Sequence, residues 1–397
     1  MFGRVNSNAS SETVVNHLTM TAGIKSYLLA RVNYFTPAWF AAVMGVGISS
    51  IILYTFPFNA RWLRILGVII WGFNMGLFGI ANILFVSRFL LHPAAFAQLL
   101  RDPTQSVFLG CWPMGFATII NMTDLQFGRD AWKATYAMWW IDVFVSLFTA
   151  WYVVFCMYSK HDRKSTESIN ATILLPVVAV VVASSTGALI TANLPKQLQE
   201  STIIITALLW GNGELLGFTC TAIYIHRLLR SNLPPSQLAI SNFLPVGPLG
   251  QGSFGIIIIT SNLATLLAER QVLTVPESAL VRYAGIGIAM AMMGYACFWV
   301  SIAFLAILTD PPKSFNPGWW GLTFPLGTFV LGWYRLADET GLLAFKVLGA
   351  IFGGIEVLLA LTCTIQSINH AVIHDTLFRA PTVAPAPNSQ TVDKETV

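Results

Sequence analysis

Three carboxylates stand inside long apolar stretches of the sequence: Asp142, Glu214 and Glu356. An ionised carboxylate in a bilayer costs so much free energy that each needs a partner or a proton, and acids in such places can relay protons. All three fall in stretches without proline, which alternate with the proline-bearing stretches described below. We therefore favour hydrogen bonding between helices or contact between subunits, and keep proton relay as the alternative.

A glycine-rich motif offers a second kind of chemistry. The segment Gly250-Gln251-Gly252-Ser253-Phe254-Gly255 matches G-x-G-x-x-G, and Glu269 follows near the spacing of a ribose-binding acid. A dinucleotide site also needs a strand before the motif, and here the motif opens an apolar run of membrane length. The match is therefore accidental, and we expect no nucleotide cofactor.

Metal-binding and catalytic side chains form no recognisable set. The five cysteines are scattered without a C-x-x-C pair. His370 and His374 stand four residues apart, on one face of a helix, but no third ligand accompanies them. No Ser/His/Asp set, phosphate-binding loop or pair of catalytic carboxylates appears at a useful spacing. The sequence predicts neither an enzyme nor a metal or cofactor site.

Prolines recur at about the length of a helical hairpin, separated by 63 to 77 residues. They are Pro37, Pro113, Pro176, Pro248 and Pro325. A proline inside a helix removes a backbone hydrogen bond, and lipid cannot satisfy the backbone groups that it frees. Kinked helices of this kind belong around a polar path. Ordinary close packing is the alternative, because glycine and proline are common in membrane helices generally.

The proline-bearing stretches hold hydroxyl groups and no acid, so a cation would find no counter-charge there. Free backbone amides and hydroxyls can receive an anion without a fixed cation that would trap it. The sequence thus predicts an anion path. Its predicted lining is Pro37, Gly45, Gly47, Pro113, Gly115, Thr118, Pro176, Ser184, Thr186, Pro248, Gly252, Pro325 and Gly327.

The composition requires a membrane around these residues. Of 397 residues, 55% are hydrophobic and 10% charged, against about 25% charged in soluble proteins. Membrane lipid is therefore an expected partner, and a net charge of +4 gives no reason to expect nucleic acid. Ten stretches have the length of a membrane helix: 32–60, 65–87, 103–123, 134–159, 168–195, 201–226, 231–268, 283–309, 314–334 and 347–369.

These stretches predict an all-α membrane protein of ten transmembrane helices in five repeated hairpins. The kinked odd helices would surround a central pore, and the even helices would lie outside them. The predicted organisation is a cytoplasmic N-terminal arm (1–31), a transport domain (32–372) and a disordered cytoplasmic tail (373–397). The Lys and Arg bias favours cytoplasmic termini, chiefly through the loop Lys160-His161-Asp162-Arg163-Lys164.

Two motifs carry a family resemblance: Phe35-Thr36-Pro37-Ala38-Trp39-Phe40 with the later Met44-Gly45-x-Gly47, and Trp319-Trp320-Gly321-Leu322-Thr323-Phe324-Pro325. On these the chain resembles, over nearly all ten stretches, the tellurite-resistance/dicarboxylate transporter family, which includes the slow anion channels of plant guard cells. Within that family, Ala60-Arg61-Trp62-Leu63-Arg64, residues 106–121 and Trp139-Trp140-Ile141-Asp142 look most like the fungal plasma-membrane sulfite efflux pumps.

The resemblance implies five inner helices around a pore, five outer helices, and a homotrimer with one pore per subunit. It also implies a phenylalanine on the ninth helix that occludes the pore. Carried onto this chain, the gate falls at Phe324, immediately before Pro325, with Phe329 and Phe254 as alternatives.

The function implied is an anion channel or secondary transporter that exports sulfite or bisulfite across the plasma membrane. The alternatives are a malate or C4-dicarboxylate transporter of the same family and a non-transporting membrane scaffold. A dicarboxylate would normally be met by a bidentate cation, and the predicted spans hold none at mid-membrane.

Overall fold

The computed structural model describes residues 29–161 and 166–374, and within these ranges the ordered elements are helices, with no strand. The all-α prediction is confirmed for this part of the chain. The chain divides into a unit from Thr36 to Ser367 and a second unit of both ends, 1–35 and 368–397. In the second unit, Arg31 Nη2 donates to the carbonyl of Ala371 (3.4 Å). The predicted arm and tail lie mostly outside the described residues, as do positions 162–165 of the basic loop.

Five helices of the larger unit have mostly buried residues. Each contacts the next in chain order, and the last contacts the first, so they close into a ring. We call them the ring helices. They are α2 (Phe40–Tyr54), α5 (Cys111–Phe127), α8 (Leu175–Thr191), α10 (Val246–Glu269) and α12 (Trp320–Thr340).

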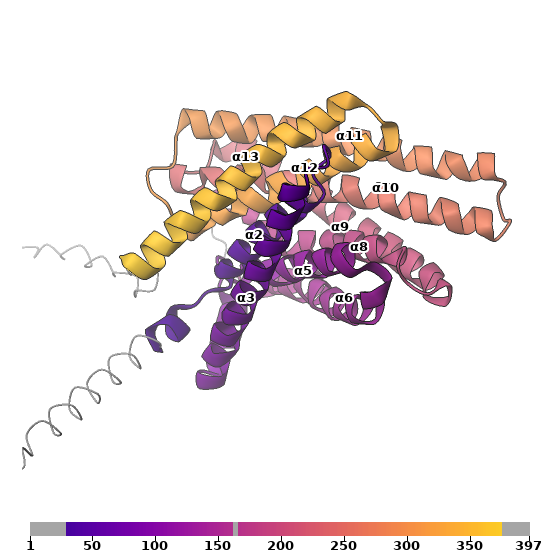
Figure 1. The fold of residues 1–397 in the computed structure, drawn as a ribbon. Helices are drawn as coiled ribbons and strands as arrows, with labels where there is room; N and C mark the ends of the chain where they lie inside the picture. The colour runs from indigo at the N-terminus through magenta and orange to yellow at the C-terminus, as the bar shows by residue number, and fades with distance from the viewer. Residues whose placement is uncertain (1–28, 162–165, 375–397) are drawn as a thin grey trace, which may run out of the picture. The chain divides into compact units, whose positions relative to one another are not determined.

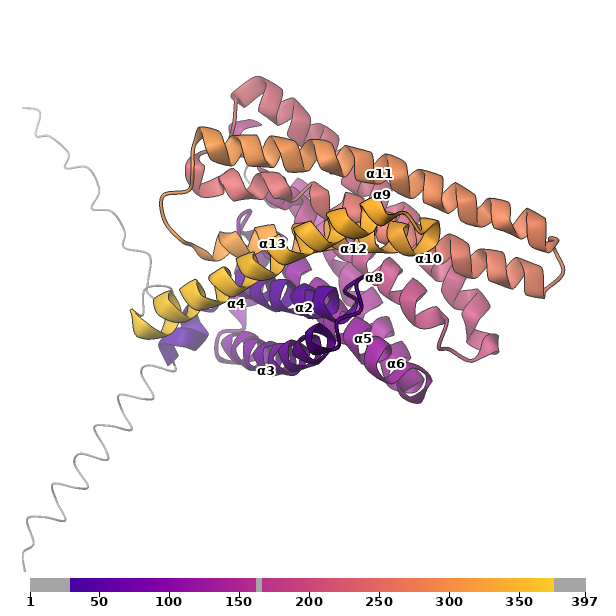
Figure 2. The same ribbon diagram turned by 45° about the horizontal axis from the view of Figure 1, so that its top comes forward.

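Longer helices follow each ring helix and expose large apolar side chains. They are α3 (Arg61–Leu91), α6 (Trp132–Leu147) continued by η4 (Phe148–Val153) and α7 (Val154–Ser159), α9 (Lys196–Ser231), α11 (Val275–Thr309) and α13 (Leu343–Ile368). In Figure 1, α10 and α11 run side by side, and in Figure 2, α13 passes over α12 and α2. Their exposed Leu, Ile and Phe side chains suit a lipid surface.

Short helices connect these elements. A 3₁₀ helix precedes every ring helix: η1 (Pro37–Trp39), η2 (Ser106–Gly110), η6 (Ala171–Leu174), η7 (Ser236–Phe243) and η8 (Pro317–Trp319). The remaining short elements are α4 (Ala94–Arg101), η3 (Gly128–Ala131), η5 (Thr166–Ser168) and, in the second unit, η9 (Asn369–Ile373).

Four of the five recurring prolines lie where a helix begins. Pro37 is the first residue of η1, and Pro176 is the second residue of α8. Pro113 and Pro248 are the third residues of α5 and α10. A proline in the first turn removes no intrahelical hydrogen bond, because those N–H groups have no partner within the helix. Pro325 lies inside α12, so the chemistry of proline requires a disturbed helix only there.

Eight helical stretches of the described residues are long and apolar enough to cross a membrane, against the ten predicted. One of the eight, Ser106–Ser159, has 54 residues, and it contains α5 and α6. Gly128, with φ of 52°, lies between these two helices in a conformation that other residues rarely adopt. Helix α12, with 21 residues, is not among the eight. Its Trp, Thr and Gly residues and Arg335 make it less apolar.

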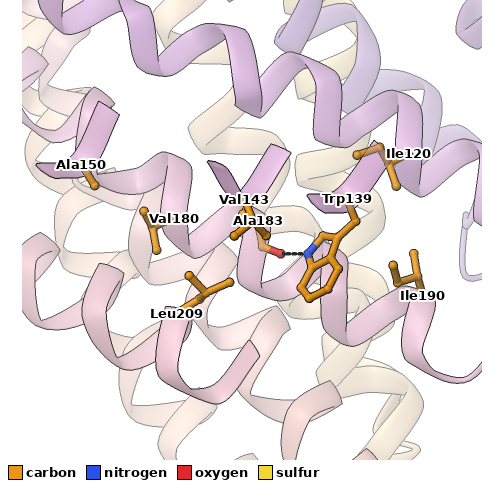
Figure 3. Packing of buried hydrophobic residues seen from close by; sticks show 8 residues of the cluster. All are labelled: Ile120, Trp139, Val143, Ala150, Val180, Ala183, Ile190 and Leu209. Atoms are coloured by element: carbon orange, nitrogen blue, oxygen red, sulfur yellow. Dashed lines mark hydrogen bonds between the residues drawn. The ribbon is translucent and has the colours of Figure 1, made fainter. Parts of the chain in front are cut away.

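The outer helices are fixed to the ring by close packing. Trp139 of α6 is fully buried, and its Nε1 donates to the Ala183 carbonyl of α8 (2.8 Å). Because lipid tails are as apolar as these side chains, fit and interhelical hydrogen bonds stabilise such contacts more than removal from water does. Figure 3 shows this cluster: Ile120, Trp139, Val143, Ala150, Val180, Ala183, Ile190 and Leu209.

Candidate functional site

Two cavities lie within the ring, toward its opposite ends. The first, of about 70 Å³, lies where the ring helices begin, and every ring helix or the segment before it contributes to the lining. We call it the N-side cavity. Its lining includes Met44, Cys111, Leu175, Ser241 and Gly321.

The second cavity, of about 170 Å³, lies toward the other end of the ring and is also lined by all five ring helices. We call it the C-side cavity. Its lining includes Ile51, Asn121, Leu189, Phe254 and Leu331. The same five helices thus contribute to both cavities.

Phe324 lies on the face of α12 between the two cavities. It is seven residues before Leu331 of the C-side cavity, which is about two helical turns, so the two side chains share a face. Gly321 of the N-side cavity lies about one turn before Phe324. The Phe324 side chain is buried, at 2% exposure. Phe324 therefore lies on the face of α12 that contributes residues to both cavities.

Apolar residues of other ring helices hold equivalent positions. On α8, Val182 lies seven residues from both Leu175 and Leu189, which line the N-side and C-side cavities. On α2, Ile48 lies about one turn from cavity-lining residues in either direction. Both side chains are buried. Like Phe324, they lie between the levels of the two cavities, and Ile48 also packs against Gly327 of α12.

The other two phenylalanines proposed for the gate lie elsewhere. The Phe329 ring packs edge-on against Phe352 of α13, with centroids 5.1 Å apart, and also contacts Trp333. Phe254 lines the C-side cavity and is partly buried. Of the three, Phe329 is directed to an outer helix, and Phe254 lies at the C-side cavity.

The glycines predicted to line the path lie at contacts between helices. A Cβ added to Gly47 would lie 1.9 Å from Thr118 Oγ1, so the glycine permits the close approach of α2 and α5. This is the close packing that the sequence left open as the alternative. The contacts pair Gly45 with Thr323, Gly47 with Thr118, Gly115 with Val43, Gly252 with Glu214, and Gly327 with Ile48.

The three predicted hydroxyls have different surroundings. Ser184 donates to the Thr206 carbonyl of the outer helix α9 (2.7 Å) and therefore faces away from the ring interior. Thr118 donates to the Gly115 carbonyl and accepts from Asn74 of α3 (3.4 Å). Thr186 is fully buried, and its Oγ1 has no hydrogen-bond partner. It lies about one turn from Leu189 of the C-side cavity.

Three polar residues beside the path were missed by the sequence analysis. Gln251 of α10 is 2% exposed, its Nε2 donates to Ser185 Oγ of α8, and its Oε1 has no partner. Asn121 and Arg335 line the C-side cavity. Gln251 belongs to the G-x-G-x-x-G segment, whose match to a dinucleotide motif is accidental. Arg335 directly follows the charge-free stretch that ends at 334.

The three acids of the outer helices are buried against the ring or beside it. Glu356 Oε1 of α13 accepts from Ser49 Oγ of α2 (2.9 Å). Glu214 of α9 fits into the space left by the missing side chain of Gly252. Asp142 of α6 is fully buried, and neither of its carboxylate oxygens has a hydrogen-bond partner. Glu356 makes an interhelical hydrogen bond of the kind that the sequence favoured, whereas Oε1 of Glu214 packs against another helix without a hydrogen-bond partner.

Among the described residues, no group of three or more His, Cys, Asp and Glu side chains could hold a metal ion. The rings of His370 and His374 lie with their centroids 6.3 Å apart. The G-x-G-x-x-G segment lies wholly within α10, so its backbone amides bind carbonyls of the helix. No strand precedes it in the described part of the chain.

Comparison with known proteins places this ring in a family. Residues 34–368 match the SLAC1 family model, described as voltage-dependent anion channel. The chain is 34% identical over 327 residues to the sulfite efflux pump SSU1 of Arthroderma otae, covering 81% of this chain and 86% of that protein. It is 29% identical over 417 residues to the sulfite efflux pump SSU1 of Saccharomyces cerevisiae, covering 88% and 91%.

A more distant relative carries a different name. The malic acid transport protein of Schizosaccharomyces pombe is 21% identical over 337 residues, covering 82% of this chain and 76% of that protein. The family match extends from the 3₁₀ helix before α2 to the end of α13 and so includes every ring helix and both cavities. The chain belongs to the SLAC1 family of voltage-dependent anion channels.

Proposed function

We propose that this protein exports sulfite or bisulfite across the plasma membrane, as an anion channel or secondary transporter. The observation that carries the proposal is the pair of cavities lined by the same five ring helices, with Phe324 on the face between them. The similarity to proteins named sulfite efflux pump, at 29% and 34% identity over most of the chain, supports sulfite as the anion.

The side chains along the ring interior suit a small, weakly bound anion. In this proposal, Phe324 and the apolar side chains at its level form an apolar constriction between the cavities. Between the cavities also lie the amide and hydroxyl groups of Gln251, Ser185 and Thr186. These groups can replace part of the hydration shell of an anion and supply no positive charge that would hold it. Phe324 closes the constriction, and movement of its ring opens the path.

The proposed architecture is ten membrane crossings in five hairpins, each a ring helix followed by an outer helix. This assignment divides Ser106–Ser159 at Gly128 and counts α12 as a crossing. Helix α12 tolerates its polar residues because they face the ring or its mouth rather than lipid. With both termini cytoplasmic, the N-side cavity opens to the cytoplasm and the C-side cavity to the exterior. A homotrimer is proposed from the family resemblance alone.

Malate or another dicarboxylate is the second candidate, supported by the 21% identity to the malic acid transport protein. Two carboxylates are normally bound by two cationic groups or one bidentate group. Arg335 is the single cation among the described residues that line the two cavities. The chemistry of the path therefore favours an anion smaller than malate.

The experiment is anion flux into proteoliposomes that contain the purified protein, measured for sulfite, nitrate, chloride and malate. Selective sulfite flux would support the proposal. Preference for malate would assign the protein to dicarboxylate transport. No flux of any anion with protein of verified fold would contradict a transport role and favour a membrane scaffold.

The Thr186→Val variant is expected to lower sulfite flux roughly fivefold, because a neutral hydrogen bond contributes about 1 kcal/mol. Valine keeps the shape of threonine and removes the unpartnered hydroxyl. The matched control is Ser184→Ala on the same helix, whose hydroxyl is bound to the Thr206 carbonyl of α9. Initial rates for both variants test this assignment, which fails if Ser184→Ala is the more damaging change.

The Glu214→Gln variant is expected to keep sulfite flux within about twofold of the wild-type rate, because the buried Oε1 has no hydrogen bond to lose and even an interhelical hydrogen bond in a membrane averages only about 0.6 kcal/mol. Glutamine keeps the shape that fits against Gly252 and cannot exchange a proton at neutral pH. Flux and expression are measured together. Abolished flux at normal expression would make Glu214 a proton relay instead.

A further inference from the structure

Arg335 lines two neighbouring cavities, and no other cationic residue of the described chain lines both. It lines the C-side cavity together with Asn121 and Asp338. It also lines a neighbouring surface cavity with Arg282 and Glu339. Its side chain is 29% exposed. A guanidinium at this place lies at the mouth of the proposed path and not inside the apolar constriction.

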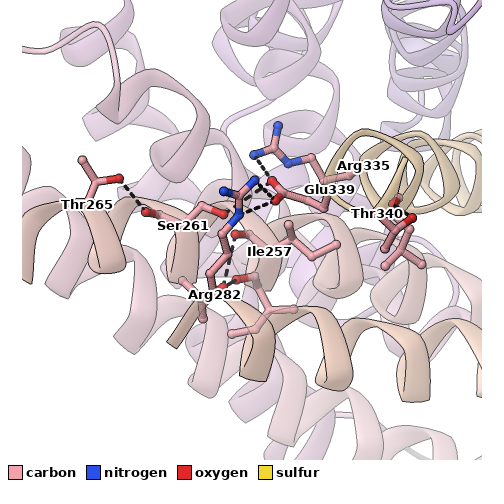
Figure 4. A network of polar contacts seen from close by, with 10 residues as sticks. Ile257, Ser261, Thr265, Arg282, Arg335, Glu339 and Thr340 are labelled. Carbon is pink, nitrogen blue, oxygen red and sulfur yellow. Dashed lines mark hydrogen bonds and ion pairs between the residues drawn. The ribbon is translucent and has the colours of Figure 1, made fainter. Parts of the chain in front are cut away.

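Its orientation is fixed by a shared carboxylate. Arg335 Nη2 lies 2.8 Å from Glu339 Oε1, one helical turn further along α12. Arg282 of α11 donates through Nε to Glu339 Oε2 (2.5 Å). The Glu339 side chain is only 3% exposed. Figure 4 shows both guanidinium groups directed to this one carboxylate.

Charged groups of both signs surround the cavity mouth. Two arginines share Glu339, and Asp338 interacts electrostatically with Arg335, Glu339 and Lys346 of α13. Glu269, which lines the neighbouring surface cavity, pairs with Lys196. Within the C-side cavity, Arg335 is the cationic group that an entering anion would meet, and Asp338 opposes that anion.

Donor groups also remain for such an anion. Arg335 Nε is buried and has no hydrogen-bond partner. Asn121 of α5 lines the same cavity, is 5% exposed, and carries a side-chain NH2 group that can donate to an anion. A guanidinium carries five N–H donors, and one carboxylate oxygen at Nη2 leaves others for a ligand. Charge-assisted hydrogen bonds of this kind are the strong ones in proteins.

We propose that Arg335 is the centre of an anion-binding site in the C-side cavity that takes a small oxyanion of the sulfite class. Glu339 holds the guanidinium in place, and Asn121 contributes its amide. The pairing with Glu339 weakens the hold of Arg335 on the anion, so that the anion is released again. This inference rests on the proposed anion transport and adds the residue that binds the anion at one mouth of the path.

The test is the half-saturating sulfite concentration for flux in proteoliposomes. For Arg335→Gln we expect it to rise roughly tenfold, equivalent to about 1.4 kcal/mol of binding free energy. The maximal rate should change much less, because Phe324 and the constriction are untouched. Arg335→Lys, which keeps the charge but loses the fork of donors, should give an intermediate value.

Arg282→Gln is the matched control, because Arg282 binds the same carboxylate but does not line the C-side cavity. We expect its half-saturating concentration to stay within about twofold of wild type. Asp338→Asn changes an exposed acid of the cavity and should lower the half-saturating concentration. This variant tests the proposal even if Arg335→Gln fails to fold.

Each result separates this site from the transport function itself. Wild-type protein that conducts no anion contradicts the proposed function. Wild-type flux with an unchanged half-saturating concentration in Arg335→Gln, or no fall in Asp338→Asn, overturns the site while transport stands. Equal effects of Arg335→Gln and Arg282→Gln would make the cluster a structural ion pair. A second readout is the thermal shift of the purified protein with sulfite, which Arg335→Gln should reduce.

Discussion

Phe324→Ala is expected to raise anion leak roughly tenfold, which corresponds to a barrier lower by about 1.4 kcal/mol. The side chain lies on the α12 face between the two cavities, and a benzyl group there excludes the water that an anion needs. Truncation to a methyl group opens the constriction without adding any charge. The measurement is anion current or flux at fixed driving force, compared with wild type at equal protein density.

Two other phenylalanines serve as controls for that result. Phe329→Ala removes a ring that packs against Phe352 of α13 and should lower thermal stability without leak. Phe254→Ala enlarges the C-side cavity and should leave the closed state closed. Leak from Phe254→Ala but not from Phe324→Ala would indicate that Phe254 of α10 is the gate instead. Unchanged conductance in a correctly folded Phe324→Ala protein would refute the gate at that position.

Gly250→Ala is expected to destabilise the folded protein. A Cβ at Gly250 would lie 2.6 Å from the backbone nitrogen of Phe329 and 2.7 Å from the Thr328 carbonyl carbon. Backbone atoms cannot move aside as a flexible side chain can, so α10 and α12 must separate. Overpacking of this kind costs about 1 to 3 kcal/mol or more. The measurement is the unfolding midpoint of the detergent-solubilised protein, which we expect to fall by several degrees.

Gly211→Ala on α9 is the matched control, because a Cβ there meets nothing within 4 Å. Alanine also favours a helix over glycine by about 1 kcal/mol, so this variant should equal or exceed the wild type in stability. If Gly250→Ala is as stable as Gly211→Ala, the close contact of α10 with α12 is not the constraint that we infer. Close packing would then also fail to explain why Gly250 of the G-x-G-x-x-G segment is a glycine.

The two kinds of variant test different properties of one ring. A gate variant changes the constriction and leaves the helix contacts in place, whereas a glycine variant forces two ring helices apart. Anion leak in the first and loss of thermal stability in the second would separate the path from the scaffold that positions it. The Arg335 variants test a third property, which is how strongly an anion is held at one mouth.

The sequence by itself determined the membrane class, the helical architecture and the family. Long charge-free stretches admit no other structure in lipid, because every backbone group must be satisfied within its own helix. Motifs such as Trp319-Trp320-Gly321 and Phe324-Pro325 carried the resemblance, and the match over residues 34–368 confirms it. It also singled out Phe324 as the proposed gate, although it could not determine that this side chain is buried.

The tertiary structure decided which residues line the ring interior. The sequence assigned Gly47 and Ser184 to the path, yet both face neighbouring helices, because periodicity does not show which face of a fully apolar helix is turned inward. It also missed Gln251 and Arg335. Their importance arises from contacts with Ser185 and Glu339, which depend on the packing of α10 against α8 and on the place of α12 in the ring. Hydrophobicity selects helices for the membrane, but only close packing orients each one about its own axis.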